Sequence, residues 1–365
     1  MPNLLFCMTP GIRLNDWEKI GSLNRELKPY VEYVRRGWKV KILTFDKGDI
    51  PALPKGIEAV RFPYHHRLLW LLPWTHKELG KWADVIKTNQ ANHAYFYTRA
   101  AVKWMKPILL RCGYVHGAYL ETTAGLTPKV RLYQWMEAKA FQQATYCQIP
   151  TKELSEWVQR KYRIPENKIS VVPNFVDTNL FKPMSGVERL TNSVISVGRL
   201  DRVKQFDLLI KACAAIPNCT LTIVGGGLER DKLVSLGRSV NLKLTLPGNI
   251  PNEQLPEILN QHHIFAITSK WEGHPKALIE AMACGMACLG VEAPGITNVM
   301  QHGQDGLIVR TEIASLKNEL SSLLSREELA EELGRVARET VEQKYSLSAC
   351  FAKELATVSA LSTKT

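Results

Sequence analysis

Short apolar segments alternate with amphipathic helical patterns along this chain of 365 residues, in two successive series. In the first series, residues 2–8 predict a buried strand, residues 22–38 predict a helix closed by Gly37, and residues 39–45 predict a second strand. A strand, a helix and a second strand form a β-α-β unit, in which the two strands are parallel and the crossover is right-handed. Further strands of this series are predicted at residues 83–88, 107–113, 144–150 and 168–173.

The second series begins after a segment in which Pro173 and Pro183 indicate a boundary between domains. Its helices are predicted at residues 206–216 and 275–285, and residues 315–361 are expected to be helical throughout. Its strands are predicted at residues 193–198, 221–227, 242–248, 263–269 and 287–291.

Two successive series of this kind predict an α/β protein with two Rossmann-like, doubly wound parallel-sheet domains that face a central cleft. We expect the first domain to span residues 1–183 and the second to span residues 184–345. Residues 346–365 are expected to form a helix that crosses back to the first domain. Because ligands of open parallel sheets bind outside the carboxyl ends of the strands, the chemistry is expected in the loops that follow the strands.

The formal net charge is +12, and the whole excess falls in residues 1–180, whereas residues 181–365 are balanced. This asymmetry predicts that the first domain faces a polyanion, either nucleic acid or an anionic membrane. The alternative is a scatter of solvated lysines without a partner. Nucleic acid is not expected as a partner, because no motif with base-reading side chains accompanies the charge.

The eight cysteines include no CxxC pair, and several lie in apolar runs. This pattern predicts small buried hydrophobic residues in a reducing compartment, with neither a disulfide framework nor a metal site. Residues 1–10 lack the basic region of a signal peptide, and no run of about 18 apolar residues predicts a membrane span. We therefore expect a cytoplasmic protein, with peripheral contact to the inner face of the membrane.

The first chemical motif is the segment SVGRLDRVKQFDLLI at residues 196–210, in which the predicted strand ends at Gly198. Arg199 and Lys204 flank the loop that opens the next helix. A helix N-terminus favours anions, a guanidinium binds phosphate oxygens as a fork, and an ammonium binds them as a point charge. The two cations predict a diphosphate site, although such a pair taken alone is an ordinary set of solvated loop charges.

The second motif, SKWEGHPKALIEAMACG at residues 269–285, contains two glutamates eight positions apart. Glu272 is expected in a loop, with Pro275 near the first turn of the following helix and Glu280 inside that helix. Glu280 can accept both hydroxyls of a ribose, and the amides after Glu272 and Gly273 can meet phosphate or sugar oxygens, because glycine allows close approach. The alternative is a capped amphipathic helix with solvent-facing glutamates. An unpaired carboxylate within the apolar run ALIEAMAC would be costly to bury, which favours the ligand site.

Together, these two motifs resemble the retaining glycosyltransferases of family 4, which have the two-domain GT-B fold. The family's two acidic residues, separated by seven others, are matched by Glu272 and Glu280. The first half of the chain resembles the family less specifically. The resemblance covers most of residues 170–310 in the family's order, with further matches at residues 173–181, 221–233 and 294–309.

The resemblance implies a metal-independent hexosyltransferase that moves a sugar from a UDP- or GDP-sugar to a glycan or lipid-linked acceptor, with retention, in polysaccharide or glycoconjugate biosynthesis. The second domain would hold the donor, and the first would supply the acceptor contacts. Arg199 and Lys204 would stabilise the departing diphosphate electrostatically, so neither a metal nor a cofactor is expected. Glu280 would bind the ribose, and Glu272 would contact the transferred sugar.

The same resemblance implies a donor-binding set in which backbone groups near Asn249 and Ile250 meet the base. The whole set is Gly11, Gly198, Arg199, Lys204, Asn249, Ile250, Glu272, Gly273, His274, Pro275, Lys276, Ala277 and Glu280.

The first half supplies further candidates in the loops after its strands. The family commonly has adjacent glycines after the first strand, but this chain has Gly11 alone, with Gly21 ten residues on, so the longer loop is also a candidate for binding the acceptor. His116 follows a predicted strand, where the family often has a histidine close to the reacting sugar. It would orient the sugar or stabilise charge there without acting as a covalent catalyst. His93 is its competitor, and a satisfied structural histidine is the alternative for both.

A glycine-rich turn, VGGGLER at residues 224–230, follows another predicted strand. The dinucleotide fingerprint G-x-G-x-x-G fails because position 230 is arginine, so NAD is not expected. The turn is interpreted as a loop that borders the donor site.

Residues 65–82 combine Trp70, Trp74 and Trp82 with a leucine run and basic residues. This mixture is typical of segments at a membrane surface. The alternative is an ordinary core-packing segment, and Pro73 interrupts any long amphipathic helix.

Two other classes of protein remain compatible with the sequence: a nucleotide-sugar epimerase or phosphorylase of the same fold, and a non-catalytic nucleotide-sugar-binding protein. The two glutamates with the upstream Arg199 and Lys204 favour transfer. The donor base and sugar, the acceptor, the linkage and the oligomeric state cannot be read from the sequence.

Overall fold

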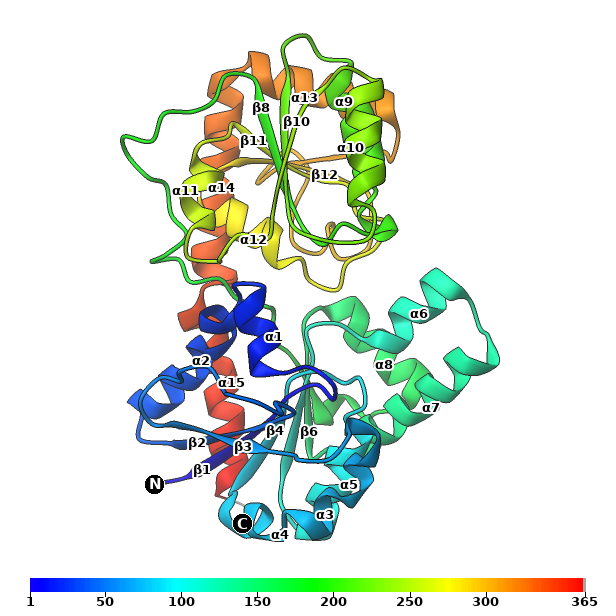
Figure 1. Cartoon of the computed structure of the whole chain (residues 1–365), viewed down its shortest axis with the longest axis vertical. Coiled ribbons are helices and arrows are strands. Elements are labelled where there is room, and N and C mark those ends of the chain that lie inside the picture. Colours follow the sequence, from blue (N-terminus) through cyan, green and yellow to red (C-terminus); the bar gives the residue numbers. More distant parts are fainter. Residues whose placement is uncertain (364–365) are drawn as a thin grey trace. The chain divides into compact units, whose positions relative to one another are not determined.

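The computed structural model describes residues 1–363 and divides the chain into two compact units (Figure 1). The first unit comprises Met1–Pro173 together with the chain from Phe351 onward, and the second comprises Asn174–Cys350. Each unit has its own parallel sheet with helices, as predicted.

The divisions do not fall at the expected positions 183/184 and 345/346. The segment after Pro173 already belongs to the second unit, because Val176 forms a bridge with Ser346 and Phe181 is buried in the second core. The last helix, α15 (Leu347–Ser362), joins the first unit from Phe351 onward. The prolines in this segment indicate turns, but they do not show which sheet the flanking residues pack against.

The sheet of the first unit has seven strands in the order β3-β2-β1-β4-β5-β6-β7, and neighbouring strands are parallel. Strand β3 was missed in the sequence because its residues are only partly buried and lack a strong apolar pattern. The strands are β1 (Asn3–Cys7), β2 (Lys39–Thr44), β3 (Ile57–Arg61), β4 (Val85–Thr88), β5 (Ile108–Arg111), β6 (Tyr146–Ile149) and β7 (Ile169–Val171).

Helices flank this sheet, and Figure 1 shows α15, in red, alongside the blue strands of the first unit. Tyr33 on α2 packs edge-on against Phe351 on α15, with ring centroids 4.8 Å apart. The helices are α1 (Leu14–Lys19), α2 (Leu23–Arg35), α3 (Leu72–Thr75), α4 (Lys77–Trp82), α5 (Tyr95–Trp104), α6 (His116–Ala124), α7 (Pro128–Gln143) and α8 (Lys152–Tyr162), with 3-10 turns η1 (His66–Leu71) and η2 (Glu166–Lys168).

The sheet of the second unit has six parallel strands in the order β10-β9-β8-β11-β12-β13. The short strand β13 was not predicted. The strands are β8 (Ser193–Val197), β9 (Thr220–Val224), β10 (Lys243–Gly248), β11 (Ile264–Ile267), β12 (Ala287–Val291) and β13 (Leu307–Val309).

The expectation of one uninterrupted helical stretch over residues 315–361 was wrong. Breaks at Arg326 and at Tyr345–Ser346 divide it into α13, α14 and α15. The helices of this unit are α9 (Phe206–Ala214), α10 (Arg230–Ser239), α11 (Leu255–Asn260), α12 (Lys276–Ala283), α13 (Ile313–Ser325) and α14 (Glu327–Lys344), with the 3-10 turn η3 (Arg202–Lys204).

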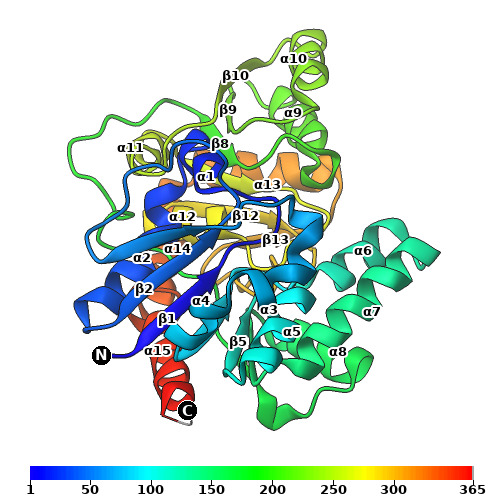
Figure 2. The ribbon, with the colours of Figure 1, turned by 60° about the horizontal axis from the view of Figure 1, so that its bottom comes forward.

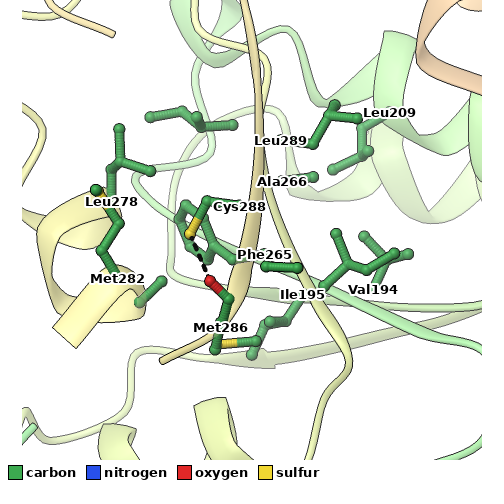
Figure 3. Packing of buried hydrophobic residues seen from close by; sticks show 14 of the residues in the cluster. Val194, Ile195, Leu209, Phe265, Ala266, Leu278, Met282, Met286, Cys288 and Leu289 are labelled. Atoms are coloured by element: carbon green, nitrogen blue, oxygen red, sulfur yellow. Dashed lines mark hydrogen bonds between the residues drawn. The ribbon is translucent and has the colours of Figure 1, made fainter. Parts of the chain in front are cut away.

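The core of the second unit is apolar on both faces of the sheet (Figure 3). Leu278 and Met282 of α12 lie on one side of the central strands, and Leu209 of α9 lies on the other. Strands β11 and β12 are buried along their whole length, as in parallel sheets covered by helices on both faces.

Each sheet contains a point at which the strand order reverses, between β1 and β4 in the first unit and between β8 and β11 in the second. Loops diverge from such a switch point at the carboxyl ends of the strands, which opens a crevice where ligands of α/β proteins bind. The loops after β8 and β11 contain the two motifs on which the functional hypothesis rests.

None of the helices within residues 1–363 is both long enough and apolar enough to cross a membrane.

Candidate active site

Hydrogen bonds join the loops after β8 and β11 at the switch point of the second sheet. The Thr268 hydroxyl donates to the backbone carbonyl of Lys204 at 2.8 Å, and the Lys270 amide donates to the carbonyl of Val203 at 2.8 Å. The conformation of one loop therefore depends on the other, and the two motifs, about 70 residues apart in sequence, form one rigid surface.

Lys204 and Glu272 form an ion pair across these two loops, with Nζ and Oε1 2.5 Å apart. The Ser269 hydroxyl donates to the same Glu272 oxygen at 2.6 Å. Gly198 lies under the lysine stem, because a Cβ at that position would come within 3.2 Å of Lys204 Cε. The structure thus brings together two of the predicted catalytic residues, and it adds Ser269, which the sequence analysis missed.

Arg199 follows Gly198, and its side chain is 76% exposed. Its Nε lies 2.7 Å from Asp201, whose other oxygen accepts from the Val203 amide and caps η3. The exposed Arg199 guanidinium remains able to bind phosphate, since an ion pair at such a position contributes at most about 1 kcal/mol.

Glycines allow three neighbouring loops to approach one another at the ends of β8, β9 and β10. Gly225 has φ +140°, and a Cβ there would lie 2.0 Å from the carbonyl oxygen of Gly198. At Gly226, an added Cβ would meet the Asn249 side chain at 3.2 Å. The glycine-rich turn is therefore a close loop-to-loop contact that brings the predicted base-binding position Asn249, with Ile250 next to it, to the same edge of the sheet.

Glu280 lies inside α12 and is almost completely buried, at 3% exposure. Its Oε1 accepts a hydrogen bond of 3.0 Å from the side chain of Asn252, which is also buried. The solvent-facing alternative for this glutamate is therefore wrong. Asn252 was not predicted, although a buried amide in the loop after β10 is a signal that a polar partner must be near.

The remaining predicted donor residues lead from Glu272 into α12. Gly273 continues the loop, Pro275 is the N-cap of α12, and Lys276 and Ala277 begin the helix. The Lys276 ammonium lies 5.8 Å from the centre of the Phe175 ring. Glu272 therefore lies three residues before the N-cap of α12.

His274 is buried in this loop, and the second unit holds it on two sides. The Asn174 side chain donates to its carbonyl at 2.9 Å, and its ring packs edge-on against Tyr345, with centroids 5.1 Å apart. Gly295 contacts the same loop, since a Cβ there would lie 2.3 Å from the Glu272 carbonyl oxygen. Both ends of the second unit therefore support the Glu272 loop.

Gly11 and His116 belong to the first unit, whereas the other predicted site residues belong to the second. Gly11 has φ +87° in the turn after β1, beside the His66 ring. His116 is the first residue of α6, and its ring lies among those of Tyr114, Tyr119 and Tyr133.

His93 is close to His116, and both rings pack edge-on against Tyr133, with centroid distances of 5.8 Å and 5.7 Å. Burial lowers the pKa of both histidines below the ordinary value, with a smaller contribution from neighbouring histidines. Both imidazoles are therefore neutral at pH 7, and each offers one donor and one acceptor nitrogen. The two candidates line one small pocket together with Tyr133.

No group of three or more histidine, cysteine, aspartate or glutamate side chains in residues 1–363 could hold a metal ion. The eight cysteines are all buried and free.

Two doubly wound parallel sheets, with a cation–carboxylate pair at the switch point of the second, define a protein of the GT-B class. The family model described as Glycosyl transferases group 1 matches residues 182–340, and the one described as Glycosyltransferase Family 4 matches residues 31–180. The chain belongs to the family 4 glycosyltransferases of group 1, which confirms the resemblance.

Two curated relatives and one solved structure illustrate this similarity. The chain is 26% identical to N-acetyl-alpha-D-glucosaminyl L-malate synthase of Bacillus anthracis over 50% of this chain and 51% of that protein. It is 29% identical to UDP-Gal:alpha-D-GlcNAc-diphosphoundecaprenol alpha-1,3-galactosyltransferase of Escherichia coli over 53% and 54%. The chain thus spans about half the length of these relatives. In fold, it is similar to Anabaena HepE in complex with UDP and glucose, with a TM-score of 0.78 and 19% identity over 99% of this chain and 100% of that one.

Proposed function

We propose that this chain is a retaining, metal-independent hexosyltransferase that moves a sugar from a UDP- or GDP-sugar to a glycan or lipid-linked acceptor. The proposal is carried by the Lys204–Glu272 ion pair at the switch point of the second sheet. A cation and a carboxylate at one position suit a ligand with an anionic diphosphate and a neutral, hydroxyl-rich sugar. Glu280, buried on α12 and held by Asn252, is the proposed ribose acceptor.

Donor binding would exchange the partners within this ion pair. A diphosphate oxygen competes with Glu272 for the Lys204 ammonium, and Arg199, exposed beside it, adds a second cation. Glu272 keeps its hydrogen bond from Ser269 and becomes available to hydroxyls of the transferred sugar.

The transfer step breaks the bond between the anomeric carbon and the oxygen of the diphosphate, and it forms a bond from that carbon to the acceptor oxygen. Departure and attack on the same face retain the anomeric configuration. The electron pair of the broken bond stays with the diphosphate, which takes up the proton of the acceptor hydroxyl. Lys204 and Arg199 stabilise the charge that develops there, which is the basis for proposing metal independence.

The first unit would supply the acceptor contacts, and His116 is its candidate for stabilising charge at the reacting sugar. The names of two similar proteins support the proposed kinds of substrate: one is named for a UDP-Gal donor and a diphosphoundecaprenol acceptor, and the Anabaena structure contains UDP and glucose. The free, buried cysteines fit the reducing cytoplasm, which is the proposed location.

Calorimetric titration with a panel of UDP-, GDP- and ADP-sugars tests the donor site. The parent is expected to prefer one donor, and Lys204→Ala and Glu280→Ala are each expected to weaken its affinity by roughly tenfold or more, about 1.4 kcal/mol. Lys317→Ala, an exposed lysine on α13, is the matched control and is expected to bind as the parent does. If both site variants bind as tightly as the parent, the site assignment is wrong.

Analysis of the products with the preferred donor separates the remaining classes of enzyme. Slow release of the free sugar, or its transfer to an added acceptor, supports a transferase, and neither should change when EDTA is added. Interconversion of the sugar would instead identify an epimerase, and binding without turnover would identify a non-catalytic protein.

We also propose that the first unit contacts an anionic membrane surface. Helices α5 and α7 carry a single acidic residue, Glu137, which is buried. On the outer face of α7, Leu132 is 59% exposed and Trp135 is 52% exposed. Lys103 of α5 lies 5.9 Å from the ring of Trp74, which is 55% exposed, so the aromatic segment at residues 65–82 continues this surface. Exposed aromatic and apolar side chains among cations are typical of interfacial segments.

Sedimentation with lipid vesicles tests this contact. The parent is expected to bind vesicles that contain anionic phospholipid and not vesicles of phosphatidylcholine alone, and the doubly substituted Leu132→Ser, Trp135→Ser variant is expected to lose most of the binding. Leu190→Ser removes a leucine of the second unit that is 50% exposed, and it should have no effect. Equal binding by all three proteins would contradict the proposed surface.

A further inference from the structure

Glu137 is a buried carboxylate of the first unit that the functional site has not yet accounted for. It lies on α7, and its two oxygens accept hydrogen bonds from the first two amides of α6. The His116 amide donates to Oε1 at 3.0 Å, and the Gly117 amide donates to Oε2 at 2.9 Å. A side chain from a neighbouring helix thus takes the place of an N-cap, since the N-cap Val115 has no capping group.

The first turn of α6 is held tightly around this carboxylate, and Figures 1 and 2 show α6, α7 and α8 beside one another. The Tyr162 hydroxyl at the end of α8 donates to Glu137 Oε2 at 2.6 Å, and Gln134 donates to the Gly117 carbonyl at 3.1 Å. A Cβ on Gly117 would lie 2.2 Å from the Tyr162 oxygen and 2.5 Å from Glu137 Oε2. Position 117 therefore admits only glycine without displacement of these groups.

The His116 ring, by contrast, lacks a polar anchor at one of its nitrogens. Its Nδ1 is buried and has no hydrogen-bond partner among residues 1–363, and the same holds for His93 Nδ1 and Asn92 Oδ1. The three residues line one pocket with Tyr133. An imidazole without such an anchor takes its orientation from its backbone and from the aromatic rings around it, so the placement of the first turn of α6 sets the position of His116.

We propose that Glu137 is a positioning residue of the transferase, which sets His116 at this pocket by holding the first two amides of α6. The inference rests on the proposed function of His116 at the reacting sugar. Glu137 does not touch the substrate, and it acts through the helix that begins at His116. The step it assists is the development of charge at the sugar, for which a misplaced imidazole is less effective.

Because Glu137 can titrate near neutral pH, its hold on the first turn of α6 is expected to depend on pH. Tyr162 donates to it from α8, and its charge acts on Cys112 in the loop after β5. Nearby, Lys161 of α8 pairs with Glu121 of α6, which also accepts from Gln134. Burial raises the pKa of Glu137 to about 7, against hydrogen bonds from Tyr162 and the two amides that lower it. Above this pH the carboxylate accepts from both amides, and below it a proton occupies one of its oxygens.

A double-mutant cycle tests the inference, with the initial rate of transfer from the preferred donor as the readout. Glu137→Gln keeps the shape but offers one acceptor oxygen in place of two, and it is expected to lower kcat roughly tenfold to a hundredfold while donor KM is unchanged. His116→Ala is expected to lower kcat by at least as much. If Glu137 acts through His116, adding Glu137→Gln to His116→Ala should lower kcat no further.

Tyr162→Phe is the second variant, because it keeps both amide contacts and removes only the hydroxyl. Since that hydroxyl lowers the pKa of Glu137, its loss is expected to move the corresponding limb of the pH profile of kcat to higher pH, with a nearly unchanged plateau. An unmoved limb would overturn the inference even if Glu137→Gln fails to fold. Unchanged calorimetric affinity for the donor verifies that the second unit is intact.

The outcomes separate this inference from the proposed function. If the effects of Glu137→Gln and His116→Ala multiply independently, Glu137 does not position His116, although transfer itself stands. If His116→Ala retains the kcat of the parent, the proposed role of His116 is wrong, and the inference is overturned with it.

Discussion

The carboxylate of Glu354 lies 2.5 Å from the ammonium of Lys87, although 267 positions separate the two residues in the sequence. Both side chains are buried, and Arg111 and the Tyr33 hydroxyl complete the cluster at 3.6 Å and 3.1 Å from the carboxylate. Burial would raise the pKa of Glu354, but Lys87 and Arg111 outweigh it and hold the pKa below its usual value. One carboxylate on the final helix thus pairs with two cations of the first sheet, on β4 and β5.

Glu354→Gln is expected to destabilise the first unit by about 3–5 kcal/mol, because it removes the carboxylate that pairs with the buried Lys87 and Arg111. Denaturant unfolding followed by tryptophan fluorescence measures this effect, since every tryptophan except Trp271 lies in the first unit. Lys353→Gln, at an exposed position beside it, is expected to change the midpoint little. Coincident unfolding curves for the two variants would show that the cluster contributes nothing.

Asn252→Asp is expected to weaken donor affinity roughly tenfold, because a second carboxylate would face Glu280, where the amide now donates at 3.0 Å. The measurement is calorimetric titration with the preferred donor. Gln254→Glu adds the same charge at an exposed position two residues on and should bind as the parent does. Equal losses in both variants would point to net charge rather than to the contact with Glu280.

Gly225→Ala is expected to abolish donor binding or prevent folding of the second unit, because a Cβ at φ +140° would lie 2.0 Å from the Gly198 carbonyl oxygen. Gly186→Ala is the matched control: its φ is +80°, but nothing lies within 4 Å of the added Cβ. It should cost only the backbone strain of about 1 kcal/mol. Thermal unfolding and donor titration of both variants distinguish a steric clash from conformational strain, and equal effects would argue against the close loop contact.

Glu137 is expected to make stability depend on pH. Its pKa is raised in the folded state from 4.5 to about 7, so its contribution is fully present below about pH 4.5 and is lost as the pH rises to about 7. By linkage, the loss amounts to roughly 3 kcal/mol. The difference in unfolding free energy between the parent and Glu137→Gln isolates this group from the histidines, whose lowered pKa values act in the opposite direction. A difference that is constant from pH 4.5 to 7.5 would contradict the prediction.

The sequence was sufficient to predict the helices and strands whose hydrophobic pattern is continuous and strong. Apolar segments such as residues 193–197 and 264–267 are recognisable as strands because they are buried on both faces, and the loops after them could be placed at the ligand edge from topology alone. Strand β3 was not predicted because it is partly exposed, and β13 was not predicted because it has only three residues. Lys204 and Glu272 were expected at one donor site, but the ion pair between them was not predicted.

Side chains whose role is to hold other groups could not be predicted. Asn252, Glu137 and Glu354 become informative only when their partners are known, and those partners lie 20 to 321 positions away. Each lies in a segment with an ordinary local pattern. A buried polar residue indicates that some partner exists, but only the tertiary structure identifies which one.

The first unit combines residues 1–173 with the chain from Phe351 onward. The ribosome therefore synthesises its sheet well before its last helix. A nascent chain that has emerged to Pro173 contains all seven strands of that sheet but lacks the acid that offsets Lys87 and Arg111. Residues 174–350 are translated in full before Glu354 arrives. The unit translated first is therefore the one completed last.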